Sequence, residues 1–179
     1  DVAMTAPMAG GRRRVDRVLD PEFVADLAGT DLQTLSAKRL DAEQEEVDLS
    51  YVRRLIQGRV DIATAEQQRR SSGSTESLVD QLASILADDN SSTTGSGRHL
   101  NAQPSRVDEH RRVVERVVSD VRISDVATLN EEQLVNAIDL LRRHEEHVSK
   151  LRRRVQGVVD ALAAEIGRRM AAETEATFN

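Results

Sequence analysis

Five polar residues occur twice in this sequence with the same spacing. The stretch EVDLSYVRRLIQGRVD and the stretch EEHVSKLRRRVQGVVD, 99 residues further on, both follow the pattern E-x3-S-x2-R-x3-Q-x3-D. The ten residues are Glu46, Ser50, Arg53, Gln57, Asp61, Glu145, Ser149, Arg152, Gln156 and Asp160. Arginine offers a rigid fork of donors for a phosphate or the O6/N7 edge of guanine, and a carboxylate accepts from the N1/N2 edge. These residue types are therefore suited to binding a guanine nucleotide.

A helix would place each set of five residues on one narrow stripe. At about 100° per residue, each set lies within an arc of roughly 80°, along about 22 Å of helix. Apolar residues flank the two stripes, and they are Leu49, Val52, Ile56, Val60 and Ala63, and Val148, Leu151, Val155, Val159 and Leu162. These apolar edges predict a coiled-coil-like seam between the two helices.

Antiparallel pairing of the helices would relate the two stripes by a pseudo-two-fold axis. The ligand that fits such an arrangement is itself two-fold symmetric, and a symmetric guanine dinucleotide has suitable acceptors and donors. The helices could pair within one chain or between two chains.

A solvated face with weak ion pairs is the structural alternative, each pair contributing about 0.3–0.5 kcal/mol. A solvated face tolerates substitution, yet all five polar identities persist between the copies. Neighbouring positions have diverged, for example Asp48 against His147 and Arg59 against Val158. This contrast favours a binding role for the repeated residues.

Two further repeated pairs are second-rank candidates for ligand binding. Arg54 and Arg153 lie next to each stripe, and Gly58 and Gly157 follow one turn later. A glycine inside a helix costs up to about 1 kcal/mol relative to alanine. Room for a ligand or for a close helix neighbour would explain that cost, and a tolerated surface glycine is the alternative.

Two long helices must position the stripes, and we predict them over residues 36–70 and 130–172. Ser36 is the expected cap of the first, and Asn130 with Gln133 forms a capping-box pattern for the second. Shorter helices are expected at 20–29, where Asp20 precedes Pro21, at 75–88 and at 105–122. Residues 1–14 read as a disordered N-terminus and 89–104 as a flexible linker. The prediction is an all-α fold with one helical domain over 15–179.

The duplication extends beyond the stripes. The segment DLQTLSAKRL, which begins at Asp31, resembles DVATLNEEQL, which begins at Asp125. This match requires a five-residue change of offset before the stripes come into line. An internal duplication is the simple account of both similarities.

Composition excludes several classes of function. The chain has no cysteine, so neither a disulfide framework nor thiolate chemistry is possible. No apolar run of about 18 residues is present, and no signal peptide is visible, so we expect a soluble cytoplasmic protein. The formal net charge of −6 argues against direct nucleic-acid binding.

The duplicated pattern resembles the signature of the RsiG family of anti-sigma factors, which bind cyclic di-GMP. All ten motif positions match, and the resemblance covers both long helices. It implies an antiparallel coiled-coil hairpin that binds a dimer of cyclic di-GMP and then sequesters the sporulation sigma factor WhiG, a flagellar-type sigma factor. By this resemblance Arg53, Arg152, Asp61 and Asp160 should contact guanine and phosphate, and the other motif residues should complete the hydrogen bonding. The chain would be a monomer before it forms a heterodimer with the sigma factor.

Two rival functions come from other classes. The segment HEEH at His144–His147 contains two histidines, but a zinc-protease helix needs them at i and i+4, and here they are at i and i+3. We therefore expect neither an enzyme nor a metal site. A coiled-coil scaffold or adaptor without a small-molecule ligand fits the periodicity equally well, but it has no need of a duplicated polar stripe.

Overall fold

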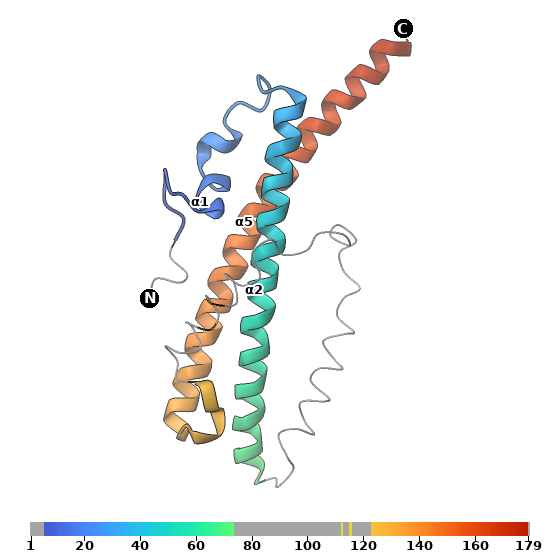
Figure 1. Cartoon of the computed structure of the whole chain (residues 1–179). Helices are drawn as coiled ribbons and strands as arrows, with labels where there is room; N and C mark the ends of the chain where they lie inside the picture. Colours follow the sequence, from blue (N-terminus) through green and yellow to red (C-terminus); the bar gives the residue numbers. More distant parts are fainter. Residues whose placement is uncertain (1–5, 74–111, 113–114, 116–122, 179) are drawn as a thin grey trace.

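Two long antiparallel helices dominate the computed structural model, which describes residues 6–73, 112, 115 and 123–178 (Figure 1). They are α2, Leu32–Ser72, and α5, Glu131–Phe178. The shorter elements are α1, Arg14–Val18, and the 3-10 helices η1, Pro21–Val24, and η2, Ile123–Thr128. The described ranges contain no strand. The predicted all-α antiparallel coiled-coil hairpin with additional short helices is confirmed.

The two long helices meet along an apolar seam with a seven-residue repeat. On each helix the innermost positions lie seven residues apart, and they are Leu35, Ala42, Leu49, Ile56 and Ala63 on α2, and Leu134, Leu141, Val148, Val155 and Leu162 on α5. All ten are buried. A strict seven-residue repeat keeps the apolar edge of one helix facing the other over many turns. Of the apolar residues predicted to flank the stripes, only Val60 is half-buried rather than buried.

The first long helix begins earlier than its sequence predicted. Its cap is Asp31, whose carboxylate accepts from the backbone N–H of Thr34 at 2.9 Å, and Ser36 lies inside the helix. At α5 the predicted capping box is confirmed, because Asn130 and Gln133 each accept from the other's backbone N–H at 2.8 and 2.9 Å. The two caps are 99 residues apart, like the motif copies. The five-residue change of offset was therefore wrong, and one offset relates the two halves.

Other predicted boundaries differ or lie outside the described residues. The expected helix at 20–29 is the short 3-10 helix η1 followed by turns, and α5 continues six residues past the predicted end at 172. The predicted helix 75–88 and linker 89–104 lie outside the described part of the chain. Of 105–122, only residues 112 and 115 are described, and both are helical. None of the described helices has an apolar stretch long enough to cross a membrane.

The N-terminal segment packs against α2 through buried ion pairs. Arg14 donates to the Asp48 carboxylate at 2.9 Å, and Asp48 is 1% exposed. Asp16 is also buried, and it accepts from the side chain of Arg13 and from the backbone N–H of Met8. The hydrogen bonds from Arg13 are the main reason that the pKa of Asp16 falls to about 2. The segment from residue 6 to 14, expected to be disordered, is thus connected to α1 by specific bonds.

A carboxylate and two arginines connect the C-terminal end of α2 to the turn before α5, which consists of η2 and Leu129. Glu66, which is 2% exposed, accepts from Arg69 at 2.8 and 2.9 Å and from Arg70 Nε at 2.6 Å. The terminal nitrogens of Arg70 donate to three backbone carbonyls of that turn, those of Val126, Ala127 and Leu129, at 3.2, 3.2 and 2.6 Å. We call Glu66, Arg69 and Arg70 the first arginine clasp.

The second arginine clasp lies at the other end of the hairpin. Glu165 accepts from Arg168 at 2.8 and 2.6 Å and from Arg169 Nε at 2.7 Å. Nη2 of Arg169 donates to the backbone carbonyls of the turn before α2, those of Leu27 and Ala28, at 2.6 and 2.8 Å. Every member of this clasp, and both carbonyls, lie 99 residues from a counterpart in the first. The two clasps are therefore related by the same pseudo-two-fold symmetry as the helices.

Acid should weaken the hairpin through the two clasp carboxylates. Hydrogen bonds from Arg69 and Arg70 lower the pKa of Glu66 from 4.5 to about 2, and Arg168 and Arg169 lower that of Glu165 from 4.5 to about 2. A carboxyl with a lowered folded-state pKa contributes stability that is fully present above its unfolded pKa and is lost as the pH falls through the folded value. The urea midpoint should therefore fall between pH 4.5 and about 2, more steeply in the wild type than in Glu66→Gln/Glu165→Gln. If the urea midpoint fell equally steeply with pH in the wild type and in the double variant, this assignment would be contradicted.

Candidate functional site

The hairpin brings the two motif copies opposite each other. Arg53 Nε on α2 donates to Glu145 Oε1 on α5 at 2.7 Å, and Arg152 Nη1 on α5 lies 3.4 Å from Glu46 Oε1 on α2. The two ion pairs join the same two motif positions in opposite directions. Their symmetry places the pseudo-two-fold axis near the two motif serines, which lie between the glutamate and the arginine of each copy. We call the ten motif residues together the motif site.

Each glutamate of the motif site accepts a hydrogen bond from the motif arginine of the opposite helix. Burial alone would raise the pKa of Glu145, but hydrogen bonds from Arg53 and from Ser149, which donates to Glu145 Oε1 at 2.9 Å, lower it below its ordinary value. The Glu46 side chain is only 5% exposed. Each motif arginine is therefore partnered by a carboxylate across the hairpin.

Motif residues from both helices line one hollow of about 220 Å³. Its motif residues are Glu46 from α2 and Gln156 and Asp160 from α5. Arg39, Glu43, Val159 and Ala163 complete the lining. Pockets that enclose a drug-sized ligand usually measure about 300–1,000 Å³. The hollow is smaller than this range, so the described residues alone would not enclose a ligand of dinucleotide size.

The motif residues differ in their exposure, since Ser149 is buried and Asp160 is exposed. Gln57 is exposed, and Ser50 and Asp61 are half-buried. Arg54 and Arg153 are both exposed, so their guanidinium groups lie on the outer side of the stripe. Part of the motif site is therefore accessible to solvent.

The two repeated glycines face open space in the described structure. A Cβ atom built at Gly58 or at Gly157 would meet no heavy atom within 4 Å. Close approach of a described helix therefore does not explain these glycines. Room for a ligand or a partner protein stays as an explanation, beside that of a tolerated surface glycine.

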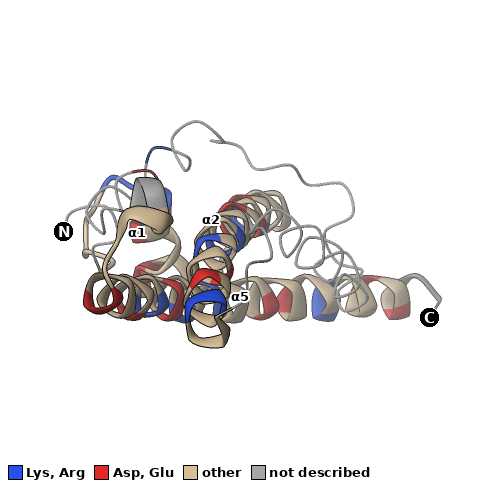
Figure 2. Ribbon diagram, turned by 90° about the horizontal axis from the view of Figure 1, so that it is seen from below, with Lys and Arg blue, Asp and Glu red and all other residues tan. Residues whose placement is uncertain are grey.

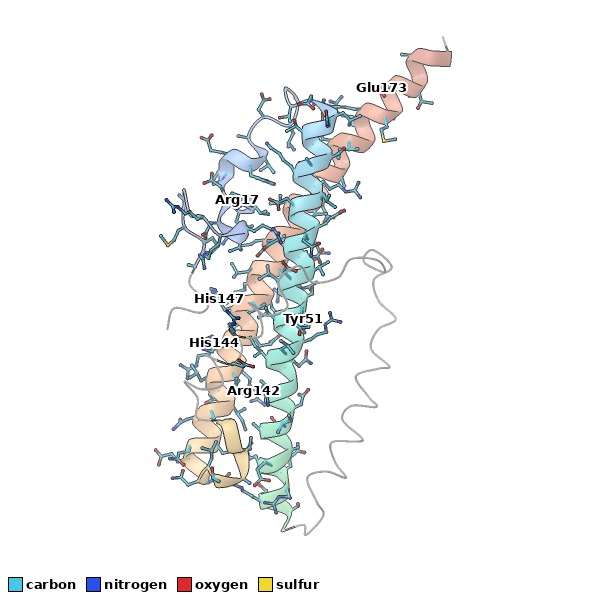
Figure 3. The ribbon with its side chains drawn as sticks, viewed as in Figure 1. Arg17, Tyr51, Arg142, His144, His147 and Glu173 are labelled. Carbon is cyan, nitrogen blue, oxygen red and sulfur yellow. The ribbon has the colours of Figure 1, made fainter. Side chains whose placement is uncertain are left out.

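The histidine pair does not complete a metal site in the described part of the chain. Figure 3 places His144 and His147 on α5. Within residues 6–73, 112, 115 and 123–178, no cluster of three or more potential metal ligands is found.

Acidic and basic positions are interspersed along both long helices (Figure 2). Beyond its last motif residue, each long helix carries the one carboxylate and the two guanidinium groups of a clasp. The first clasp lies on α2 and the second on α5. This mixture differs from the one-sided basic stripe of a typical nucleic-acid-binding surface.

Sequence reasoning missed two groups of residues near the site. The clasps were detectable, because the pattern E-x2-R-R follows the last motif aspartate at the same distance in both copies. Arg39 and Glu43 in the hollow gave no such signal, since their counterparts 99 residues on are Ile138 and Arg142. Helical spacing places both on the same face of α2 as Glu46, and the packing of α5 brings them beside Gln156 and Asp160.

Comparison with known proteins gives one result that bears on this site. A sequence model of the family described as RsiG-like matches residues 21–86 and 120–178. These ranges include both motif copies, both clasps and the whole of the two long helices. A comparison with curated proteins found no significant match.

Proposed function

The chain belongs to the RsiG-like family, and from this premise we propose that it is an anti-sigma factor controlled by cyclic di-GMP. The ligand-loaded protein binds the flagellar-type sigma factor WhiG in the cytoplasm, withholds it from RNA polymerase and so represses sporulation genes. The supporting observation is the reciprocal pairing of the motif copies, Arg53 with Glu145 and Arg152 with Glu46.

The symmetry of the motif site favours a symmetric ligand. Each half offers one arginine, one glutamate, one aspartate, one glutamine and one serine, related by the pseudo-two-fold axis. Cyclic di-GMP, or a stacked pair of its molecules, presents guanines and phosphates in symmetric sets. Arginine can donate twice to the O6/N7 edge or to a phosphate, and carboxylates accept from N1 and N2. One chain carries both halves, so a monomer can bind the ligand before forming a heterodimer with the sigma factor.

Ligand binding would exchange the partners of the motif ion pairs. Arg53 and Arg152 are bound to carboxylates across the hairpin. A phosphate or a guanine edge can replace the carboxylate as the acceptor for each guanidinium group. The released carboxylate can then accept hydrogen bonds from guanine N–H groups. The hydrogen bonds are replaced rather than lost, so the exchange avoids the cost of leaving buried polar groups unpaired.

The charge of the motif site indicates why a partner protein would strengthen binding. The ten residues include two arginines and four carboxylates, while each cyclic di-GMP molecule adds two negative charges. Even with Arg54 and Arg153, the site only reaches neutrality before the ligand arrives. Basic groups of the sigma factor would supply the missing positive charge and cover the open side of the hollow.

A ligand between the two proteins can control their association. It must bind the complex more tightly than the separate proteins, because a ligand with equal affinity for both states shifts nothing. By the same linkage, the sigma factor must raise the affinity for cyclic di-GMP by the factor by which the ligand raises the affinity for the sigma factor.

Calorimetric titration of cyclic di-GMP into the chain, with and without WhiG, tests the proposal. We expect saturable binding that is tighter when WhiG is present. Cyclic di-AMP is the matched control ligand, because adenine carries an N6 donor where guanine carries the O6 acceptor. Binding of neither ligand in either condition, by a well-folded helical protein, would favour the scaffold function instead.

A further inference from the structure

The two arginine clasps have a consequence for the motif site. Each clasp connects the C-terminal part of one motif helix to the turn that precedes the other. Arg70 does this between α2 and the turn before α5, and Arg169 does it between α5 and the turn before α2. The hairpin is therefore tied at both ends by directional hydrogen bonds to backbone carbonyls.

The apolar seam alone would leave the axial register weakly specified. Its innermost positions repeat every seven residues and hold only Leu, Ile, Val and Ala. Apolar contacts are non-directional, so a helix that slides by one repeat meets similar side chains. Each residue of sliding moves one helix by about 1.5 Å, which is enough to disrupt a motif hydrogen bond such as Arg53 Nε to Glu145 at 2.7 Å.

We propose that Arg70 and Arg169 are positioning residues, which set the helix register that brings the two motif copies opposite each other. In both clasps Nε of the arginine is bound by the glutamate, at 2.6 Å in one and 2.7 Å in the other, and the terminal nitrogens reach the turn. The glutamate thus orients the guanidinium group of the arginine. The guanidinium group in turn holds the turn that precedes the opposite helix. Neither arginine belongs to the motif site or lines the hollow. Their effect on ligand binding is therefore indirect, because they set the register of the two helices that carry the motif. This consequence for the ligand rests on the proposed function.

The chain offers a matched control for each clasp arginine. Arg69 and Arg168 bind the same glutamates and lie one residue away, but their hydrogen bonds in the described structure go to the glutamate and not to a turn carbonyl. The variant Arg70→Gln/Arg169→Gln removes two charges together with the bonds to the turns. Arg69→Gln/Arg168→Gln removes two charges and leaves those bonds in place. Arg70→Lys/Arg169→Lys keeps the charge and a single donor group.

The register can be measured in the free chain because the sequence contains no cysteine. Spin labels at Ser36→Cys and Asp139→Cys would lie on exposed positions of α2 and α5. Given the observed register, these positions are separated along the hairpin by roughly 35 Å at 1.5 Å per residue, so sliding changes their distance almost directly. We expect one narrow distance peak in the wild type and in Arg69→Gln/Arg168→Gln. Arg70→Gln/Arg169→Gln should shift or broaden it by several Å, and the lysine variant should restore it in part.

Titration of cyclic di-GMP in the presence of WhiG completes the test. We expect Arg70→Gln/Arg169→Gln to bind at least about 10-fold more weakly, with helix content retained, and Arg69→Gln/Arg168→Gln to bind like the wild type. The proposal is overturned by an unchanged distance peak, by a shifted peak with unchanged affinity, or by equal losses in the two glutamine variants. If Arg70→Gln/Arg169→Gln does not fold, Arg70→Lys/Arg169→Lys decides by the same criteria. If the wild type binds no cyclic di-GMP, the proposed function fails, and the spin-label distances alone decide whether the clasps set the register.

Discussion

Replacing both Arg53 and Arg152 with alanine should weaken cyclic di-GMP binding by at least about 100-fold in the presence of WhiG. Each guanidinium would donate charge-assisted hydrogen bonds to the ligand, and such bonds contribute about 1.5–3 kcal/mol. Two of them correspond to roughly 100-fold to 10,000-fold in the dissociation constant. Calorimetry measures the loss directly. The pseudo-two-fold symmetry further predicts similar losses for Arg53→Ala and Arg152→Ala made separately.

The matched control is Arg59→Ala/Arg154→Ala. Both residues are exposed arginines on the same two helices, and neither belongs to the motif. This variant removes the same formal charge, so a general electrostatic effect would weaken binding equally in both double variants. Unchanged affinity in Arg53→Ala/Arg152→Ala would remove the motif arginines from the binding site and leave their ion pairs with the glutamates as structural contacts.

Replacing Leu35 with alanine should destabilise the folded chain by about 2–5 kcal/mol, the usual cost of truncating a buried leucine. Leu35 is 0% exposed and lies in the apolar cluster that includes the seam. Its counterpart Leu134 is also 0% exposed, so Leu134→Ala should have a comparable effect. Urea unfolding followed by circular dichroism measures the change in the free energy of unfolding.

Leu40→Ala is the control for this prediction, because it makes the same substitution five residues further along the same helix. Leu40 is 68% exposed, so its truncation should change the free energy of unfolding by no more than about 0.5 kcal/mol. Similar effects at Leu35 and Leu40 would indicate that the seam does not account for the stability of the hairpin.

Local patterns in the sequence were enough to predict the two long helices and the face that each presents to the other. Apolar periodicity identified the seam, and the spacing of the motif placed ten polar residues beside it. Asn130 and Gln133 predicted the start of α5 because both halves of a capping box lie within one turn. All of these patterns depend on residues within a few turns of one another, and helical geometry relates such residues directly.

The start of α2 was predicted wrongly because both Asp31 and Ser36 are suitable caps. The packing of Leu35 explains the difference, since this residue must already be helical to enter the seam beside its neighbours at seven-residue spacing. The repeat offset of 99 residues, applied from Asn130 back to Asp31, would have given the correct cap.

The sequence by itself determined an all-α chain made of two related halves, each with a polar motif beside an apolar edge. Only the tertiary structure decided which groups meet. It pairs Arg53 with Glu145 across 92 positions of chain while the adjacent Arg54 stays exposed, and it directs Arg70 and Arg169 to turns in the opposite half. The physical reason is that such contacts depend on the direction and axial register of two helices, which no local pattern specifies.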